Sequence, residues 1–319
     1  MKSAPTNPGD SARPSRWADR LFHAACLAGA LSVLVLLVLV AYQLYHGSQH
    51  ARTEFGWKFL ISTTWDPVDE HYGALPFIYG TFMTAFIGLL IAVPLSVGSA
   101  IYLTELAPLS LRQPLVSVIE MLAAVPSVIW GLWGIFVLVP FLRVDVYPFL
   151  QKFLGFLPVF QGPIYGIGVM TGGVIVAIMI LPIVTSVSRE VVRSVPNLQR
   201  EAAYGLGATR WEVTRIAVLS YARRGIFGAA VLGLGRALGE TMAVTMVIGN
   251  SSEISKSLFA PGYTMASVIA NEFAEATTDR YLSALFAIGL VLLGLTIVIN
   301  ILAALMIRAI SSAETRRVH

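Results

Sequence analysis

The sequence predicts an all-α integral membrane protein of about six transmembrane helices, and three observations support this fold class. Apolar residues make up 56% of the 319 residues and charged residues only 13%, whereas soluble domains carry about 25% charged residues. The apolar residues gather in stretches near the length of about 20 residues that a helix needs to cross the hydrocarbon core. Lysines and arginines are concentrated in the loops that would share one side of the membrane.

Six stretches are predicted to cross the membrane: residues 21–45, 75–104, 115–142, 164–187, 226–248 and 282–307. Each is predicted to be helical because hydrocarbon offers backbone amides no partner, and a helix satisfies them internally. The first stretch follows Arg20 and has no small-residue cleavage site behind it, so we expect a retained anchor. Prolines inside the second, third and fourth stretches favour kinks or local unwinding; they are Pro94, Pro126 and Pro182.

Basic residues set the predicted orientation. If the N-terminus is cytoplasmic, 15 of the 22 lysines and arginines lie on that side: Lys2, Arg13, Arg16, Arg20, Arg112, Arg189, Arg193, Arg200, Arg210, Arg215, Arg223, Arg224, Arg308, Arg316 and Arg317. Cytoplasmic loops typically carry this excess, so both termini are predicted to be cytoplasmic. We expect a cytoplasmic tail over residues 1–20, a transmembrane domain over 21–310 and a second cytoplasmic tail over 311–319. Contact with lipid headgroups accounts for the basicity, so no nucleic-acid partner is expected.

Residues that bind metals or cofactors are sparse. The single Cys26 lies within the first stretch, which excludes an internal disulfide and a cysteine-based metal site. His46 and His50 have the spacing of metal ligands on a helix, but no third ligand accompanies them. We therefore expect neither a metal nor a cofactor.

Opposite charges four residues apart lie near the middle of the fifth stretch. Arg236 and Glu240 occur in the run GLGRALGETMAV, and this spacing places both on one face of a helix. A charge at the bilayer centre must face protein, water or solute, so a translocation path is the functional interpretation. A guanidinium matches two oxygens of an oxyanion such as phosphate. The alternative is a buried ion pair that only fixes helix register.

Glu120, in the third stretch, is a further candidate for the path. Its position near the inner end of that stretch leaves simple hydration or headgroup contact equally open. The glycines Gly233, Gly235 and Gly239 resemble a dinucleotide loop only in spacing, because they lie inside a membrane stretch with no preceding strand. Close helix packing through small residues explains them better.

The chain lacks the sequence of an ATPase. No G-x-x-x-x-G-K-[ST] occurs, and none of its lysines follows a glycine, so the phosphate cradle of a P-loop is absent. The chain is therefore predicted not to be an enzyme.

The longest inner loop, about residues 188–224, carries a more specific pattern. Its run EAAYGLGATRWEVTRIAVLS resembles the EAA loop of ABC-importer permeases, with Glu201, Ala202, Ala203 and Gly207 on the defining positions. In that family the loop forms a short helix that docks into a groove of the cytoplasmic ATPase. Adjacent alanines allow close approach, and the glycine permits a sharp exit. The family pattern closes with Leu-Pro, whereas this chain has Leu219 and Ser220; the alternative is an amphipathic helix on lipid headgroups.

Further runs extend the resemblance. In order, FGWKFL, YGALPFIYGT, AVPLSVGSAIYLTELAP, AAVPSVIWGLWG, GLGRALGETMAV and ANEFAEA resemble the PstC-type phosphate permease family over residues 55–310. The resemblance implies a MetI-like permease fold in the bacterial inner membrane and phosphate as substrate. It also implies a PstA-type second permease, a PstB-type ATPase in two copies and an external PstS-type phosphate-binding protein.

The expected function is therefore the permease subunit of an ATP-driven phosphate importer. Three rivals stay open at this point. One is a permease for another oxyanion, such as sulfate or molybdate. Another is a carrier driven by an ion gradient, with Arg236 and Glu240 as a relay. The last is a membrane sensor or scaffold that transports nothing.

Overall fold

The structure, a computed structural model, describes residues 16–315. The predicted tails therefore lie outside the described residues over 1–15 and 316–319. The chain divides into two units, residues 1–46 and residues 47–319. The first unit contains one long helix, α1 (Arg16–Gly47). The functional site described below lies in the second unit.

The second unit is helical throughout its described length, apart from connecting loops and two isolated backbone bridges. Its α-helices are α2 (Gln49–Glu54), α3 (Lys58–Ile61), α4 (Leu75–Ile101), α5 (Leu109–Ala123), α6 (Ser127–Trp133), α7 (Val139–Phe141), α8 (Tyr147–Leu154), α9 (Val169–Arg193), α10 (Asn197–Gly205), α11 (Arg210–Val213), α12 (Leu219–Leu238), α13 (Met242–Ile248), α14 (Met265–Glu272) and α15 (Asp279–Thr315). Short π-helical segments continue some of them, at Tyr102–Leu106, Gly134–Leu138, Leu142–Val146 and Thr214–Val218, and a 3₁₀ turn covers Pro158–Phe160.

Six helical runs among the described residues are long and apolar enough to cross a membrane. They are Asp19–Gly47, Leu75–Leu106, Ser127–Leu154, Val169–Arg193, Arg210–Leu238 and Asp279–Arg308. The predicted all-α membrane fold with six transmembrane helices is confirmed. The predicted ends are less accurate, above all in the third and fifth stretches.

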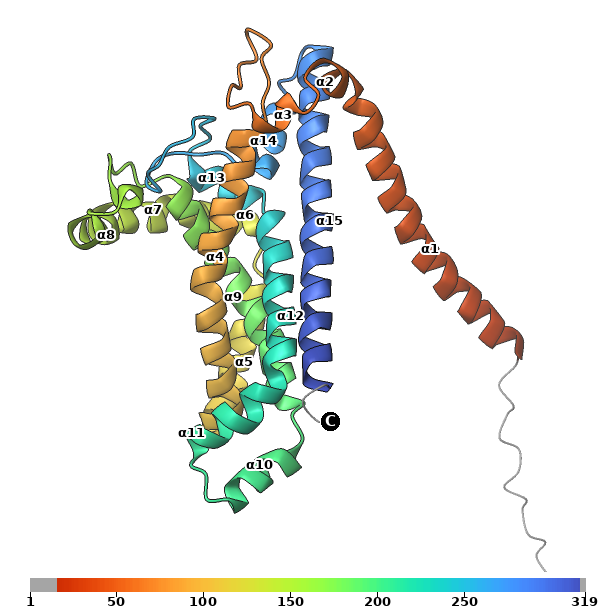
Figure 1. The fold of residues 1–319 in the computed structure, drawn as a ribbon, viewed down its shortest axis with the longest axis vertical. Coiled ribbons are helices and arrows are strands. Elements are labelled where there is room, and N and C mark those ends of the chain that lie inside the picture. The colour runs from red at the N-terminus through yellow and green to blue at the C-terminus, as the bar shows by residue number, and fades with distance from the viewer. Residues whose placement is uncertain (1–15, 316–319) are drawn as a thin grey trace, which may run out of the picture. The chain divides into compact units, whose positions relative to one another are not determined.

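Helix α9 forms the centre of the second unit. It packs against α4 and α12, which run beside it along the long axis together with α15 (Figure 1). In the most apolar part of α9, 67% of the residues are buried inside the unit, whereas in the most apolar part of α15 only 6% are. The outer helices therefore present Leu, Ile and Val to their surroundings, as helices in lipid do.

Small residues interlock α4 with α9. A side chain added at Gly88 of α4 would come within 2.7 Å of Val176 of α9, so only glycine allows this approach. Further along α4, the Ser96 hydroxyl donates a hydrogen bond of 3.0 Å to the carbonyl of Leu181 on α9, the residue before Pro182. Such contacts replace the hydrophobic driving force that helices lack in lipid.

Two of the predicted crossings are interrupted. The predicted third stretch is made of α5 and α6, which are separated where Pro126 precedes the first residue of α6. Beyond α6 the chain turns, and α7 and α8 extend away from the bundle (Figure 1). The predicted fifth stretch, 226–248, is likewise two helices, because α12 ends at Leu238 and α13 begins at Met242. Sequence periodicity does not reveal such breaks, since both flanking segments are apolar.

The two ends of the bundle differ in composition. We call the end formed by α10, α11 and the Tyr102–Leu106 segment the α10 end, and the end formed by α2, α3 and α14 the α14 end (Figure 1). The α14 end holds an aromatic cluster in which Trp65 packs edge-on against Tyr72 and Phe77, at ring distances of 5.0 and 4.8 Å. These rings therefore pack on one another at the α14 end.

Candidate functional site

The Arg236 and Glu240 pair forms at the break between α12 and α13. Arg236 Nη2 lies 3.2 Å from Glu240 Oε2, across the last turn of α12. The other oxygen of Glu240 accepts a hydrogen bond of 3.3 Å from the Ala243 amide, in the first turn of α13. The carboxylate therefore bridges the end of one helix and the start of the next, and Arg236 holds it there.

The two side chains differ sharply in exposure. The Glu240 side chain is 4% exposed, whereas that of Arg236 is 46% exposed. A buried carboxylate with two donors is a fixed charge, and the half-exposed guanidinium keeps donors turned toward the surface of the unit. The arrangement offers an anion a guanidinium that is already oriented by its own counter-charge.

Packing against α9 fixes the depth of this pair. A side chain added at Gly233 would come within 2.7 Å of Val184, and 3.8 Å of Ile180. Both residues lie near the middle of α9 (Val169–Arg193). Arg236, one turn beyond Gly233, is therefore near mid-depth of a helix long enough to span the membrane. Of the glycines for which the sequence predicts close helix packing, Gly233 makes such a contact.

The break between α5 and α6 lies beside the break between α12 and α13. A side chain added at Gly131 of α6 would lie 3.2 Å from Ala243, and one added at Gly134 would lie 2.8 Å from Val247. Helices α6 and α13 therefore pack against one another. Each begins directly after an interruption, α6 after Pro126 and α13 after the end of α12 at Leu238.

Glu120 is not part of this cluster. It lies on α5, its side chain is 59% exposed, and its Oε1 is 3.6 Å from Arg189 Nη2 on α9. Hydration near a helix end, the alternative that the sequence leaves open, suits such a position. A role for Glu120 in the translocation path stays a prediction that proximity does not support.

The predicted coupling residues lie on α10 and in the turn that follows it. Glu201 and Ala202 are exposed, Ala203 is half-buried, and Gly207 lies in the turn with φ +84°. Left-handed backbone of this kind strains any residue with a Cβ, which explains the glycine. Glu201 lies one turn beyond the start of α10, outside its first turn.

Three large apolar side chains on α10 and in the turn after it are exposed. Leu206, in that turn, is 91% exposed, and Leu198 and Tyr204 of α10 are exposed as well. After the turn, Thr209 and Glu212 form a reciprocal capping box that begins α11. The segment is therefore an ordered helical projection with uncovered apolar side chains, as a docking element requires.

Sequence reasoning missed the ion pair that holds this projection to the bundle. Arg200 Nη2 lies 2.9 Å from Glu105 Oε1, in the π-helical segment after α4, and both side chains are only 16% exposed. Arg200 also donates to the Val192 carbonyl at 3.0 Å and to the Val195 carbonyl. A lone carboxylate at the end of an apolar stretch, as in IYLTELAP, is the signal that points to such a partner.

The α14 end is organised by carboxylates and phenols. Glu272 Oε2 accepts hydrogen bonds from Trp65 Nε1 at 2.8 Å and from the Tyr281 hydroxyl at 2.6 Å. Burial raises the pKa of Tyr72, and nearby Glu70 adds to this effect. Burial likewise raises the pKa of Tyr263. Both phenols therefore stay protonated at neutral pH.

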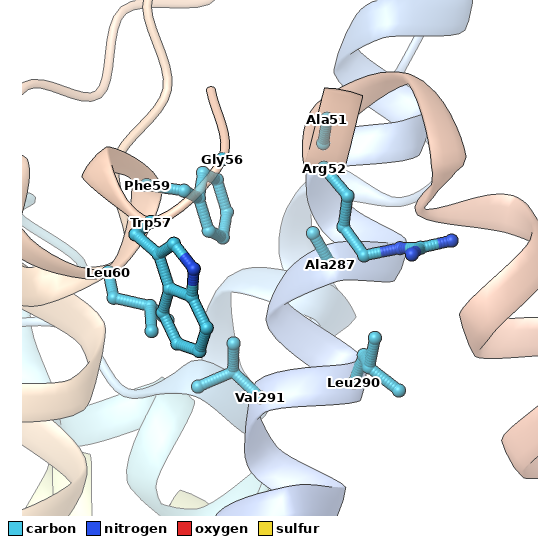
Figure 2. A pocket seen from close by; sticks show the side chains of 9 residues that line it. All are labelled: Ala51, Arg52, Gly56, Trp57, Phe59, Leu60, Ala287, Leu290 and Val291. Carbon is cyan, nitrogen blue, oxygen red and sulfur yellow. The ribbon is translucent and has the colours of Figure 1, made fainter. Parts of the chain in front are cut away.

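A cavity of about 350 Å³ at the α14 end does not suit an anion. Apolar side chains of α3 and α15 line it, among them Trp57, Phe59 and Val291. Arg52 is the basic residue of its lining, and Figure 2 shows its guanidinium turned away from Trp57 and Phe59. Its Nε donates to the Ser48 hydroxyl at 3.1 Å. The Arg236 and Glu240 pair therefore remains the better anion site.

Comparison with known proteins gives a consistent result. The family described as "Binding-protein-dependent transport system inner membrane component" matches residues 92–312. The chain is 51% identical to the phosphate transport system permease protein PstC of Mesorhizobium japonicum, over 92% of this chain and 91% of the relative. It is 47% identical to the PstC of Xylella fastidiosa, over 98% and 97% of the two chains. With the PstC of Haemophilus influenzae it shares 48% identity over 91% and 93%.

Solved structures agree on the fold. A bacterial alginate ABC transporter in complex with an alginate pentasaccharide-bound periplasmic protein aligns with a TM-score of 0.61 at 16% identity, over 92% of this chain and 98% of the other. The MetNI methionine ABC transporter, in an inward-facing conformation, aligns with a TM-score of 0.51 at 17% identity, over 74% and 94%. At these identities the likeness concerns the arrangement of helices alone.

Proposed function

The chain belongs to the family of binding-protein-dependent transport system inner membrane components, and we propose that the solute it carries is phosphate. It is a multi-pass membrane permease subunit of an ABC importer and not an enzyme. Importers of this family combine a second permease, an ATPase and an external binding protein. Relatives at 47–51% identity over nearly the whole chain are named phosphate permeases, which supports phosphate over sulfate or molybdate.

The observation that supports a translocation path at this place is the exposure of Arg236 at mid-depth of the membrane. A charged side chain at the bilayer centre costs about 2.5–3.5 kcal/mol on insertion scales, so the half-exposed guanidinium does not face hydrocarbon. We infer that this surface faces the second permease and that phosphate crosses between the two subunits. The paired helix breaks suit this place, because irregular backbone at membrane depth is tolerated where it lines a cavity or is buried in protein.

The two charges have different parts in the proposed path. Arg236 presents N–H donors in the planar arrangement that matches two phosphate oxygens. Glu240 orients the guanidinium while the path is empty and accepts a hydrogen bond from a protonated phosphate oxygen when it is filled. Sulfate carries no such proton at neutral pH, so it meets the buried carboxylate with repulsion alone.

We assign the α10 end to the cytoplasm and α10 to docking on the ATPase. Glu201, Ala202, Ala203 and Gly207 form the docking element, with Leu198 and Leu206 as its apolar contacts. The transmembrane permease domain covers residues 21–310, and both tails are cytoplasmic. The partners are a PstA-type permease, a PstB-type ATPase in two copies and a PstS-type phosphate-binding protein outside. Alternating access then couples movement of α10 to the path near Arg236.

Reconstitution tests the proposal directly. The purified complex of both permeases and the ATPase is placed in vesicles with the binding protein, and uptake of radiolabelled phosphate is measured. We expect uptake that requires ATP, survives collapse of the proton gradient and is not reduced by excess sulfate or molybdate. Uptake driven by the proton gradient without ATP contradicts the assignment, as does preferential uptake of either competing oxyanion.

A further inference from the structure

Four arginines converge on a hollow of about 430 Å³ at the α10 end. They come from three helices: Arg112 from α5, Arg189 and Arg193 from α9, and Arg200 from α10. Glu105 is the carboxylate among the described lining residues, and it pairs with Arg200 at 2.9 Å. Glu120, 3.6 Å from Arg189, is a further carboxylate nearby. The hollow therefore keeps an excess of positive charge.

One donor atom of Arg112, which lines this hollow, lacks an acceptor. Its Nη2 donates to the Ala107 carbonyl at 3.3 Å. Its Nε is buried and has no hydrogen-bond partner within the part of the chain that the structure describes. Buried donors in proteins are nearly always paired, so an unpaired one beside three other guanidinium groups indicates an anion that binds there.

An apolar groove adjoins the basic hollow. It has a volume of about 440 Å³ and lies between α4 and α5. Pro94, Leu95, Gly98 and Ile119 line it, and Leu103 lines both the groove and the hollow. Between them, Leu103, Ile119 and Arg189 also line a small gap that is too narrow to hold a water molecule. One surface thus combines a basic site at the helix ends with an apolar channel that runs along the helices.

We propose that this surface binds an anionic phospholipid of the leaflet at the α10 end. The headgroup phosphate is held by Arg112, Arg189 and Arg193, and an acyl chain lies in the groove over Gly98. Basic pockets between transmembrane helices on the cytoplasmic side are suited to anionic headgroups, because charge and depth match. Free inorganic phosphate would explain the arginines but not the adjoining groove. An uncharged lipid would explain the groove but not the arginines.

The site is separate from the docking surface of α10. Arg200 and Asn197 line the hollow from α10, and Arg200 is 16% exposed, whereas Leu206 of the following turn is almost fully exposed. A lipid in the hollow therefore contacts α10 at Asn197 and Arg200, and none of the proposed docking residues Glu201, Ala202, Ala203 and Gly207 lines the hollow.

Lipid retention by the purified complex provides the test. The complex is exchanged into nanodiscs that contain phosphatidylcholine and a trace of spin-labelled phosphatidylglycerol, and the immobilised fraction of the label is measured. We expect preference for phosphatidylglycerol over an equally labelled phosphatidylcholine. Removing two guanidinium groups with Arg112→Gln and Arg193→Gln should weaken that preference by about fivefold for each. The matched control, Arg143→Gln with Lys152→Gln, removes exposed basic residues outside the hollow and should leave the preference unchanged.

A second pair of variants separates lipid from free phosphate. No atom lies within 4 Å of a side chain added at Gly98, in the groove, or at Gly294, on α15. Gly98→Trp should fill the groove and reduce lipid retention, whereas Gly294→Trp should not. Binding of radiolabelled inorganic phosphate that depends on Arg112 but not on Gly98 would overturn the lipid assignment. Equal retention of both lipids by the unmodified complex would overturn the site altogether.

Discussion

Arg200 and Glu105 join α10 to the end of α4 through an ion pair of 2.9 Å. Both side chains are 16% exposed, so the pair is shielded from bulk water. Arg200 also donates to the Val192 carbonyl near the end of α9. One side chain therefore ties the docking helix to the two helices that form the centre of the bundle.

Arg200→Ala should loosen α10 and uncouple transport from ATP hydrolysis. Removing one member of a buried pair strands the other charge, at a cost of about 3–5 kcal/mol when the pair is fully buried and less here. Hydrogen exchange across residues 197–205 should accelerate at least tenfold, and phosphate uptake should fall by a similar factor. Arg210→Ala removes an exposed arginine from α11 and serves as the control. Unchanged exchange in Arg200→Ala would show that the pair does not hold the helix.

Arg236→Ala should abolish phosphate uptake, by more than about 100-fold, and leave the complex assembled. The guanidinium is half-exposed, and the buried Glu240 carboxylate keeps its hydrogen bond from the Ala243 amide after the guanidinium is lost, so the cost to assembly stays small. Copurification of the partners measures assembly, and uptake at saturating phosphate measures function. Arg236→Lys keeps the charge but not the two-pronged geometry, so partial uptake is expected.

The double variant Arg236→Ala with Glu240→Gln distinguishes a pair that lines the translocation path from a pair that only fixes helix register. If the pair contacts phosphate, the double variant assembles but stays inactive. If the pair only fixes helix register, neutralising both charges restores much of the transport. Near-normal uptake in the double variant would remove the main reason for placing the path at this helix break.

Gly207→Ala should reduce ATPase binding although it introduces no clash. No atom lies within 4 Å of the added Cβ, so the effect comes from the φ of +84° alone, at about 1–2 kcal/mol. Gly205→Ala is the matched control, because this glycine is also uncrowded but lies within α10. It should be neutral or stabilise the helix. Equal ATPase pull-down by the two variants would argue against a role for the turn in docking.

Cysteine labelling should place the two ends of the bundle on opposite sides of the membrane. In a Cys26→Ser background, an impermeant reagent outside intact cells should label Val68→Cys, an exposed position before α4, and not Arg210→Cys. The expectation rests on the excess of basic residues at the α10 end. The reverse labelling pattern would invert the proposed topology.

The sequence predicts the number of crossings well because apolar length is a local property. It does not predict the breaks at Pro126 and Gly239, because each interrupts a stretch that is apolar on both sides. Proline identifies one break as a possibility, and a proline inside an intact helix, such as Pro94 of α4, is equally common. Which of them opens the helix depends on neighbours that only tertiary packing provides.

In the candidate site, too, contacts between residues close in sequence could be predicted, and contacts between distant residues could not. Arg236 and Glu240 are predictable as a pair because they lie four residues apart, and the structure brings them together. The pairing of Arg200 with Glu105 is not, since 95 residues separate them. Glu120 illustrates the opposite case, because a charge near a helix end has several ways to reach water and the sequence does not select among them.

Because α4 and α9 are packed closely together, a rigid-body rotation would move the two helices as one. A helix of 25 residues such as α9 is about 37 Å long. Pivoting it by about 5° at the α14 end displaces its other end by about 3 Å and its middle, beside Gly233, by half as much. The geometry of a hydrogen bond tolerates only about 0.5 Å. A modest swing of this kind would therefore shift the middle of α9 against Gly233 of α12 by more than a hydrogen bond at that level tolerates.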